Sequence, residues 1–199
     1  MVDKQGRLSL AYQNLSEIPA NVQKHHASQI YQLDLSHNKF SDLRSLEDFT
    51  NLHTLILDNN ELTSHVSFPH LPSISTLWLN RNKISNLSVI VEKLRTRFPK
   101  LKYLSLMNNP GAPSFFNGGT YQQYMDYRHY VISQLPSLET LDDQFINMEE
   151  RLEAVRIYKQ MVSKKKTIKT AKKKRRKKSS PTGDEEPEVL QVGDTVDIE

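Results

Sequence analysis

The sequence of 199 residues contains no cysteine. Disulfides, thiolate metal sites and cysteine nucleophiles are therefore excluded, and a reducing compartment is the typical setting for such a composition. No apolar run approaches the ~18 residues of a membrane-spanning helix, and the first residues, MVDKQGRLSL, contain no apolar signal region. The sequence predicts an intracellular protein without a transmembrane segment. Its predicted location is cytoplasmic, with the nucleus as the alternative.

Motifs of catalysis are also missing from the sequence. It contains no glycine-rich phosphate loop, no HExxH motif and no serine elbow. The seven histidines do not follow the spacing of common zinc sites, and Asp142–Asp143 has no evident acid partner. We predict that the protein is not an enzyme and has no catalytic, cofactor-binding or metal-binding residues.

Charge is unevenly distributed along the chain. Residues 1–163 are neutral overall, residues 164–178 carry 11 basic and no acidic side chains, and residues 179–199 carry 7 acidic and no basic ones. This composition predicts a disordered tail over residues 164–199, basic and then acidic. A nuclear-import (importin-binding) or anion-binding arm is predicted at Lys172, Lys173, Lys174, Arg175, Arg176, Lys177 and Lys178. Its alternatives are a solvated tail, contact with nucleic-acid phosphates and contact with anionic lipid.

A repeated pattern, LxLxxN, occupies the neutral part of the chain. It begins at Leu33, Leu55, Leu77 and Leu104, so successive copies are 22, 22 and 27 residues apart. The asparagines keep the same spacing, at Asn38, Asn60, Asn82 and Asn109. A weaker copy, LSLAYQNL, covers residues 8–15 and suits a terminal, capping repeat. Each copy offers a short strand that buries its leucines only when neighbouring copies stack.

The pattern resembles the leucine-rich repeat family, most clearly at residues 52–62 (LHTLILDNNEL) and 74–84 (ISTLWLNRNKI). The resemblance implies an α/β solenoid of the short, 22-residue type with a parallel, concave sheet. An asparagine amide can satisfy the backbone groups of the turn that follows each strand. We therefore interpret the four asparagines as framework residues.

The segments between strands are predicted to be helical or irregular. Residues 43–49 suit a helical or 3₁₀ turn, and residues 87–98 suit an α-helix that ends before Pro99. The run YRHYVISQLPSLETLD, from Tyr127 to Asp142, resembles the C-terminal cap of several leucine-rich repeat proteins. The predicted domain of repeats and cap covers residues 1–146. A C-terminal helix over residues 147–163 is expected to pack back on the cap through Met148, Leu152, Val155 and Val162.

A partner surface is predicted on the side chains that alternate with the buried leucines. They form three rows across the strands: Gln32, Thr54, Thr76 and Tyr103; then Ser9, Asp34, Ile56, Trp78 and Ser105; then Ser36, Asp58, Asn80 and Met107. We call this surface the concave face. Its predicted partner-binding residues are Asp34, Ile56, Asp58, Trp78, Asn80, Tyr103 and Met107. Trp78 is the single tryptophan of the chain, and tryptophan is typical of interface hot spots. The alternative is that other segments of the chain cover it.

These features predict a non-enzymatic adaptor that binds a protein partner on the concave face. Residues 33–145 look most like family members linked to melanocyte differentiation or organelle trafficking, although the polybasic arm and the fuller N-terminal repeat depart from them. One alternative, from the similar cap motif, is a nuclear ribonucleoprotein subunit of the spliceosomal type. Another is a regulatory subunit of an enzyme such as a phosphatase.

Overall fold

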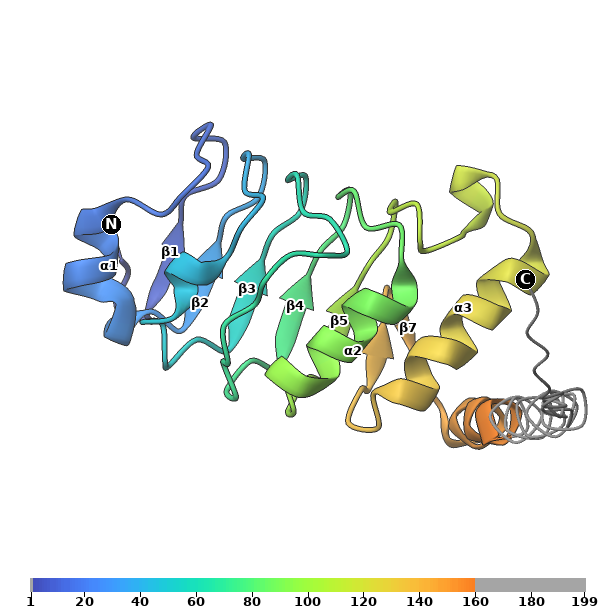
Figure 1. Cartoon of the computed structure of the whole chain (residues 1–199). Coiled ribbons are helices and arrows are strands. Elements are labelled where there is room, and N and C mark those ends of the chain that lie inside the picture. Colours follow the sequence, from blue (N-terminus) through green and yellow to red (C-terminus); the bar gives the residue numbers. More distant parts are fainter. Residues whose placement is uncertain (1, 160–199) are drawn as a thin grey trace, which may run out of the picture. The chain divides into compact units, whose positions relative to one another are not determined.

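Seven short strands lie side by side in one sheet in the computed structural model, which describes residues 2–159 of the chain (Figure 1). In sheet order they are β1 (Arg7–Ser9), β2 (Gln32–Asp34), β3 (Thr54–Ile56), β4 (Thr76–Trp78), β5 (Tyr103–Ser105), β6 (Thr140–Leu141) and β7 (Gln144–Phe145). Strands β1 to β6 are parallel, and β7 pairs with β6 in the antiparallel sense. The predicted repeats are confirmed, and the leucines at the strand centres pair in one continuous row.

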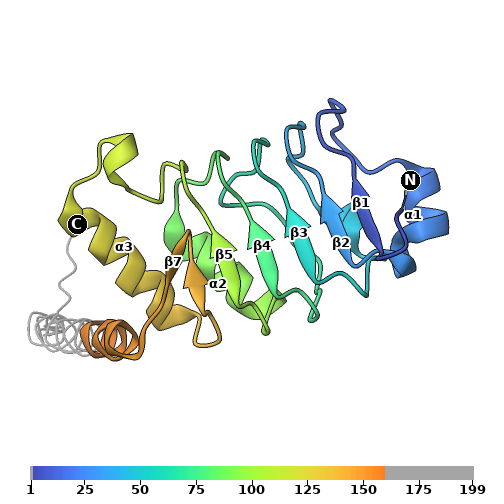
Figure 2. The same cartoon turned by 180° about the vertical axis from the view of Figure 1, so that it is seen from behind.

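The core lies between the strands and the segments that return from one strand to the next. These segments contain α1 (Ala20–His26), η1 (Ala27–Gln29), η2 (Arg44–Leu46), α2 (Leu87–Arg97), η3 (Phe115–Asn117) and α3 (Tyr121–Gln134). Helix α2 lies in front of the sheet in Figure 1, and the sheet is seen from its other side in Figure 2. The predicted inward face of α2 is confirmed, because Ile90, Val91 and Leu94 are fully buried.

The asparagine of each repeat joins two neighbouring turns. The side-chain Oδ1 of Asn82 accepts a hydrogen bond from the Leu62 N–H at 3.1 Å, and its Nδ2 donates to the carbonyls of Leu57 and Leu79, both at 3.0 Å. Asn38, Asn60 and Asn109 make the equivalent contacts. All four side chains are buried. Their predicted role as framework residues agrees with this geometry, since they satisfy backbone groups that water cannot reach.

A left-handed backbone residue precedes each of these asparagines. His37, Asn59, Arg81 and Asn108 have φ angles of 56°, 52°, 52° and 58°. The conformation reverses the chain after the strand, so the next residue turns its amide inward. Tyr12, with φ of 59°, holds the same place in the weak first copy.

The C-terminal cap is fixed by two groups of polar contacts, one centred on Asp142 and one on Arg128. The Tyr127 hydroxyl donates to Asp142 Oδ2 at 3.1 Å, while Asp142 Oδ1 accepts from the Leu106 N–H at 2.9 Å. The buried Arg128 guanidinium pairs with the Glu150 carboxylate at 2.6 Å and also donates to the Leu141 carbonyl. Burial raises the pKa of both Asp142 and Tyr127. Asp142 is therefore part of the cap, as predicted.

The C-terminal helix differs from the prediction in the face that it buries. The described part of this helix covers residues 148–159, and the Asn147 side chain accepts from the Glu150 N–H at 2.8 Å at its start. Met148 and Leu152 are largely exposed, whereas Ala154 is fully buried. The expected contact of Met148 and Leu152 with the cap is therefore wrong. Val155 is half-buried, and Val162 lies outside the described residues. The Arg128–Glu150 pair and the bond from Arg151 to the Leu138 carbonyl set the rotation of the helix instead.

Helix α1 was not predicted, because its sequence has weak end signals. Pro19 precedes it without a side-chain cap, and it has no acidic residue in its first turn. Val22 nevertheless packs into the core, as does Ile18 just before the helix. The predicted tail over residues 164–199, with its arm from Lys172 to Lys178, lies outside the described residues.

Replacing Asn82 by alanine should lower the free energy of unfolding by about 2–4 kcal/mol, because several buried backbone groups lose their partners. Urea denaturation of the full chain measures the change. Asn21→Ala is the control, since Asn21 is exposed on α1 and should change stability by less than about 0.5 kcal/mol. Equal effects of the two substitutions would contradict the framework role of Asn82.

Candidate functional site

The strand register gathers the predicted partner residues on one face of the sheet. Ile56 lies opposite Trp78 on the adjacent strand, and Thr76 lies opposite Tyr103 on the next. Trp78, Tyr103 and Met107 are all exposed, and Ile56 is partly exposed. The three rows therefore lie in the predicted order, with an apolar patch over β3, β4 and β5. Figure 2 views the sheet from the side opposite α2.

Trp78 remains open to solvent. Its side chain is 44% exposed, so neither the N-terminal repeat nor the C-terminal cap covers it in the part of the chain that the structure describes. Its neighbours along the strand, Leu77 and Leu79, are fully buried. Side chains alternate along the strand, so the two leucines pack in the core and the tryptophan between them faces outward.

The polar part of the concave face is connected by hydrogen bonds. Ser105 Oγ donates to Asn80 Oδ1 at 2.6 Å, and Asn80 Nδ2 donates to Asp58 Oδ2 at 3.2 Å. The Asp34 carboxylate accepts from the Ser36 N–H and from Ser9 Oγ. Ser105 is buried, so it supports the chain of contacts and offers little surface. Asp58, Asn80 and Asp34 are held in defined orientations, which limits the entropy lost when a partner binds.

Burial raises the pKa of Asp58 above its usual value, and the nearby Asp34 carboxylate adds to this effect. The hydrogen bonds from Asn80 act in the opposite direction, but burial is the largest influence. The folded protein therefore holds a proton on Asp58 more readily than the unfolded chain does.

Phe145 also belongs to the concave face, which sequence reasoning missed. Thr140 pairs with Tyr103 on one side and with Phe145 on the other, so the three residues share one row. Phe145 is 72% exposed. In this region the sequence predicts only a cap motif. In the structure, Asp142 has a φ of 59° and reverses the chain, which adds β7 to the sheet. The acidic residues between Leu141 and Phe145 are typical of turns, and they are the feature of the sequence that could have indicated this reversal.

The exposed residues of the concave face combine apolar side chains with oriented polar ones. Within residues 2–159, no three histidine or acidic side chains lie together in a group that could hold a metal ion. Across the same range, no helix is long and apolar enough to cross a membrane. The predicted arm, Lys172 to Lys178, falls outside the described residues, so its role stays a prediction.

Replacing Asp58 by asparagine should have a pH-dependent effect on stability. Because the pKa of Asp58 is raised by folding, its contribution is fully present below its unfolded pKa of about 3.9 and is lost as pH rises through the folded value. The stability of the wild type relative to Asp58→Asn should therefore fall as pH rises. Urea denaturation between pH 3 and pH 7 (roughly the window around the carboxyl pKa values) measures this difference.

Asp42→Asn is a control of opposite sign. The Arg44 N–H and guanidinium lower the pKa of Asp42, so its contribution is present above the unfolded pKa and is lost as pH falls through the folded value. The wild type should gain stability relative to Asp42→Asn as pH rises. A common direction for the two variants would show that burial does not control Asp58.

Comparison with known proteins agrees with this geometry. A family profile described as the leucine-rich repeat matches residues 20–173. The human leucine-rich melanocyte differentiation-associated protein is 40% identical over 128 residues, which cover 62% of this chain and 65% of that protein. The U2 small nuclear ribonucleoprotein A' of Arabidopsis thaliana is 33% identical over 132 residues, which cover 65% of this chain and 48% of that protein. The chain thus spans less than two thirds of either relative.

A solved structure has the same fold. A chain in the crystal structure of the Drosophila melanogaster SNF/U2A' complex superimposes with a TM-score of 0.59 at 25% sequence identity, over 75% of this chain and 79% of that one. The stacked strands, the asparagine turns and the matched profile lead to one assignment. The chain belongs to the leucine-rich repeat family.

Proposed function

We propose that this chain is a non-enzymatic adaptor that binds a protein partner on the concave face. The observation that supports the proposal most strongly is the apolar patch of Ile56, Trp78, Tyr103 and Met107 on three adjacent strands, with Phe145 in the same row as Tyr103. An exposed tryptophan among apolar neighbours has the composition of an interface hot spot. Asp34 and Asp58 form the acidic edge of the patch.

A partner that docks on the face of this parallel sheet contacts side chains and not backbone groups. Strands β2 to β5 have neighbours on both sides, so their backbone groups are engaged and strand addition at these positions is blocked. Recognition would then depend on shape and on the desolvation of Trp78, with the fixed polar groups around it setting the orientation of the partner.

The human relative is named for melanocyte differentiation. We propose that this chain has a related role, as an adaptor in pigment-cell differentiation or organelle trafficking. The likeness extends over 128 residues, which are 62% of this chain.

A second candidate is a subunit of a nuclear ribonucleoprotein. It is favoured by the 33% identity to the plant U2 small nuclear ribonucleoprotein A' and by the fold of the chain from the SNF/U2A' complex. In this case the basic residues from Lys172 to Lys178 would serve as a nuclear-import signal.

Deleting residues 164–178 from the full chain should separate the two candidates. Imaging of tagged protein with and without this segment is the measurement. Nuclear accumulation that is lost on deletion would favour the ribonucleoprotein subunit. The deleted segment carries 11 basic side chains, and nuclear-import signals are rich in such residues. Cytoplasmic puncta in both forms would favour the trafficking adaptor.

Replacing Trp78 by alanine should weaken capture of the concave-face partner by about 30-fold, which is the effect of losing one hot-spot residue of about 2 kcal/mol. Partners recovered by affinity capture with the full chain are identified first, and each is then titrated against the wild type and the variant. The thermal stability of the variant should stay close to that of the wild type, since the indole is outside the core.

Tyr12→Ala is the matched control for this substitution. Tyr12 is an exposed aromatic residue in the loop after β1, where it stacks on His37. Its removal should leave partner affinity unchanged. Equal affinity of the wild type and Trp78→Ala for every titrated partner would end the proposal.

A further inference from the structure

A groove of about 680 Å³ lies where the loops after β4 and β5 meet the C-terminal cap. Its less exposed side is formed by Met107 and Tyr124, and its outer rim by Phe115, Phe116 and Tyr121. The segment between β5 and α3 (yellow-green in Figure 1) carries Phe115 and Phe116 and leads into α3, which begins at Tyr121. The groove adjoins the concave face at Met107, but the rest of its lining lies beyond that face.

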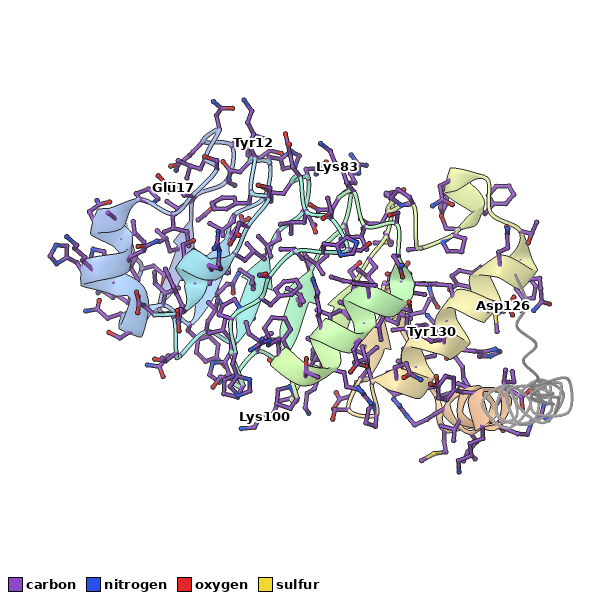
Figure 3. All side chains as sticks on the ribbon, viewed as in Figure 1. Tyr12, Glu17, Lys83, Lys100, Asp126 and Tyr130 are labelled. Atoms are coloured by element: carbon purple, nitrogen blue, oxygen red, sulfur yellow. The ribbon has the colours of Figure 1, made fainter. Side chains whose placement is uncertain are left out.

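Two phenylalanines on the rim are almost fully in solvent. Phe115 is 89% exposed and Phe116 is 92% exposed. Apolar rings usually leave solvent when the chain allows it, and a contiguous exposed pair marks an interaction site more often than a random surface. Side chains projecting from the ribbon are shown in Figure 3.

The turn that carries these rings is held in place by hydrogen bonds. Asn117 Oδ1 accepts from the Ser114 N–H at 2.7 Å, and Asn117 Nδ2 donates to the Ala112 carbonyl at 2.9 Å. Gly118, at φ of 82°, and the bond from the Gly119 N–H to the Ser114 carbonyl close the turn. The turn therefore presents both rings outward in a preorganised conformation, which favours binding.

Opposite charges lie at the two ends of the groove. Arg81 follows β4 and Asp143 follows β6, with the β5 repeat between them. Strands β4 and β6 are two strand spacings apart in the sheet, roughly 10 Å. Neither side chain makes an ion pair with another residue of the 2–159 range. The adjacent Asp142 carboxylate is already occupied by Tyr127 and Leu106, so Asp143 supplies the free negative charge.

We propose that this groove binds a linear segment of a partner protein. A bulky apolar side chain of that segment packs against Phe115 and Phe116, with an acidic residue directed to Arg81 and a basic residue directed to Asp143. In an extended chain, which advances ~3.3 Å per residue, the two charged residues are about three positions apart. The groove shares Met107 with the Trp78 patch, but its other lining residues lie outside that patch. The proposal does not depend on the function proposed for the patch.

A membrane is the other surface that exposed phenylalanines could enter, but the charges nearby disfavour it. Residues 110–124 contain no lysine or arginine, and Asp142 and Asp143 lie on the same groove. Anionic lipid attracts basic side chains and repels carboxylates. A peptide with one charge of each sign matches Arg81 and Asp143 better.

Selection of a random 12-residue peptide-display library on the full chain tests the proposal. The selected peptides should share a bulky apolar residue between an acidic and a basic one. Phe115→Ser with Phe116→Ser should lower their affinity at least tenfold without changing the melting temperature, since both rings are exposed. Arg81→Glu should also lower it about tenfold, and a peptide whose acidic residue is changed to lysine should regain binding to that variant.

Trp78→Ala and Tyr12→Ser serve as controls and should bind the selected peptides like the wild type. The proposal is overturned if no sequence is enriched, or if the selected peptides bind the phenylalanine double variant as tightly as the wild type. Equal losses for Trp78→Ala and the double variant would assign the peptides to the concave face and overturn it too. Binding of the chain to phosphatidylcholine–phosphatidylserine vesicles that requires Phe115 and Phe116 would assign the rim to membranes instead.

Discussion

Each of the four central repeats depends on one buried amide group, the side chain of the asparagine that follows the strand. A solenoid brings each turn against the next, so backbone N–H and C=O groups are buried where no regular ladder reaches them. Asn38, Asn60, Asn82 and Asn109 supply an acceptor to the preceding turn and donors to carbonyls of both turns. An unpaired group at such a place costs roughly 1–3 kcal/mol. The amide thus sets both the curvature of each turn and the stacking of its neighbour.

The array requires a different solution at its C-terminal end, because the last repeat has no following turn. Arg128 from α3 and Glu150 from the next helix form a buried pair, and the Arg128 guanidinium also donates to the Leu141 carbonyl. A buried ion pair is specific in geometry but contributes little net stability when compared with apolar packing. Its clearer effect is to place the helix over residues 148–159 in one orientation, with Met148 and Leu152 outside the core.

Two of the surfaces that carry exposed apolar side chains are proposed here as partner sites. One is the Trp78 patch on the sheet, and the other is the groove rim at Phe115 and Phe116. The two surfaces are held by different structures. Trp78 is exposed by the alternation of side chains along β4, whereas the phenylalanines are exposed by a hydrogen-bonded turn. Two surfaces of different shape on one rigid array suit a protein that brings partners together.

Periodicity in the sequence determined strands β1 to β5, the inward leucines, the asparagine turns and the position of Trp78. These features depend on a local pattern that recurs in each copy. The placement of Phe145 beside Tyr103 could not be obtained in this way, since it depends on a reversal at Asp142 and on the pairing of β6 with β7. The rotation of the last helix and the charged ends of the groove were likewise decided by tertiary contacts. Local patterns specify which side chains face inward, whereas contacts between residues distant in the chain decide which outward side chains meet.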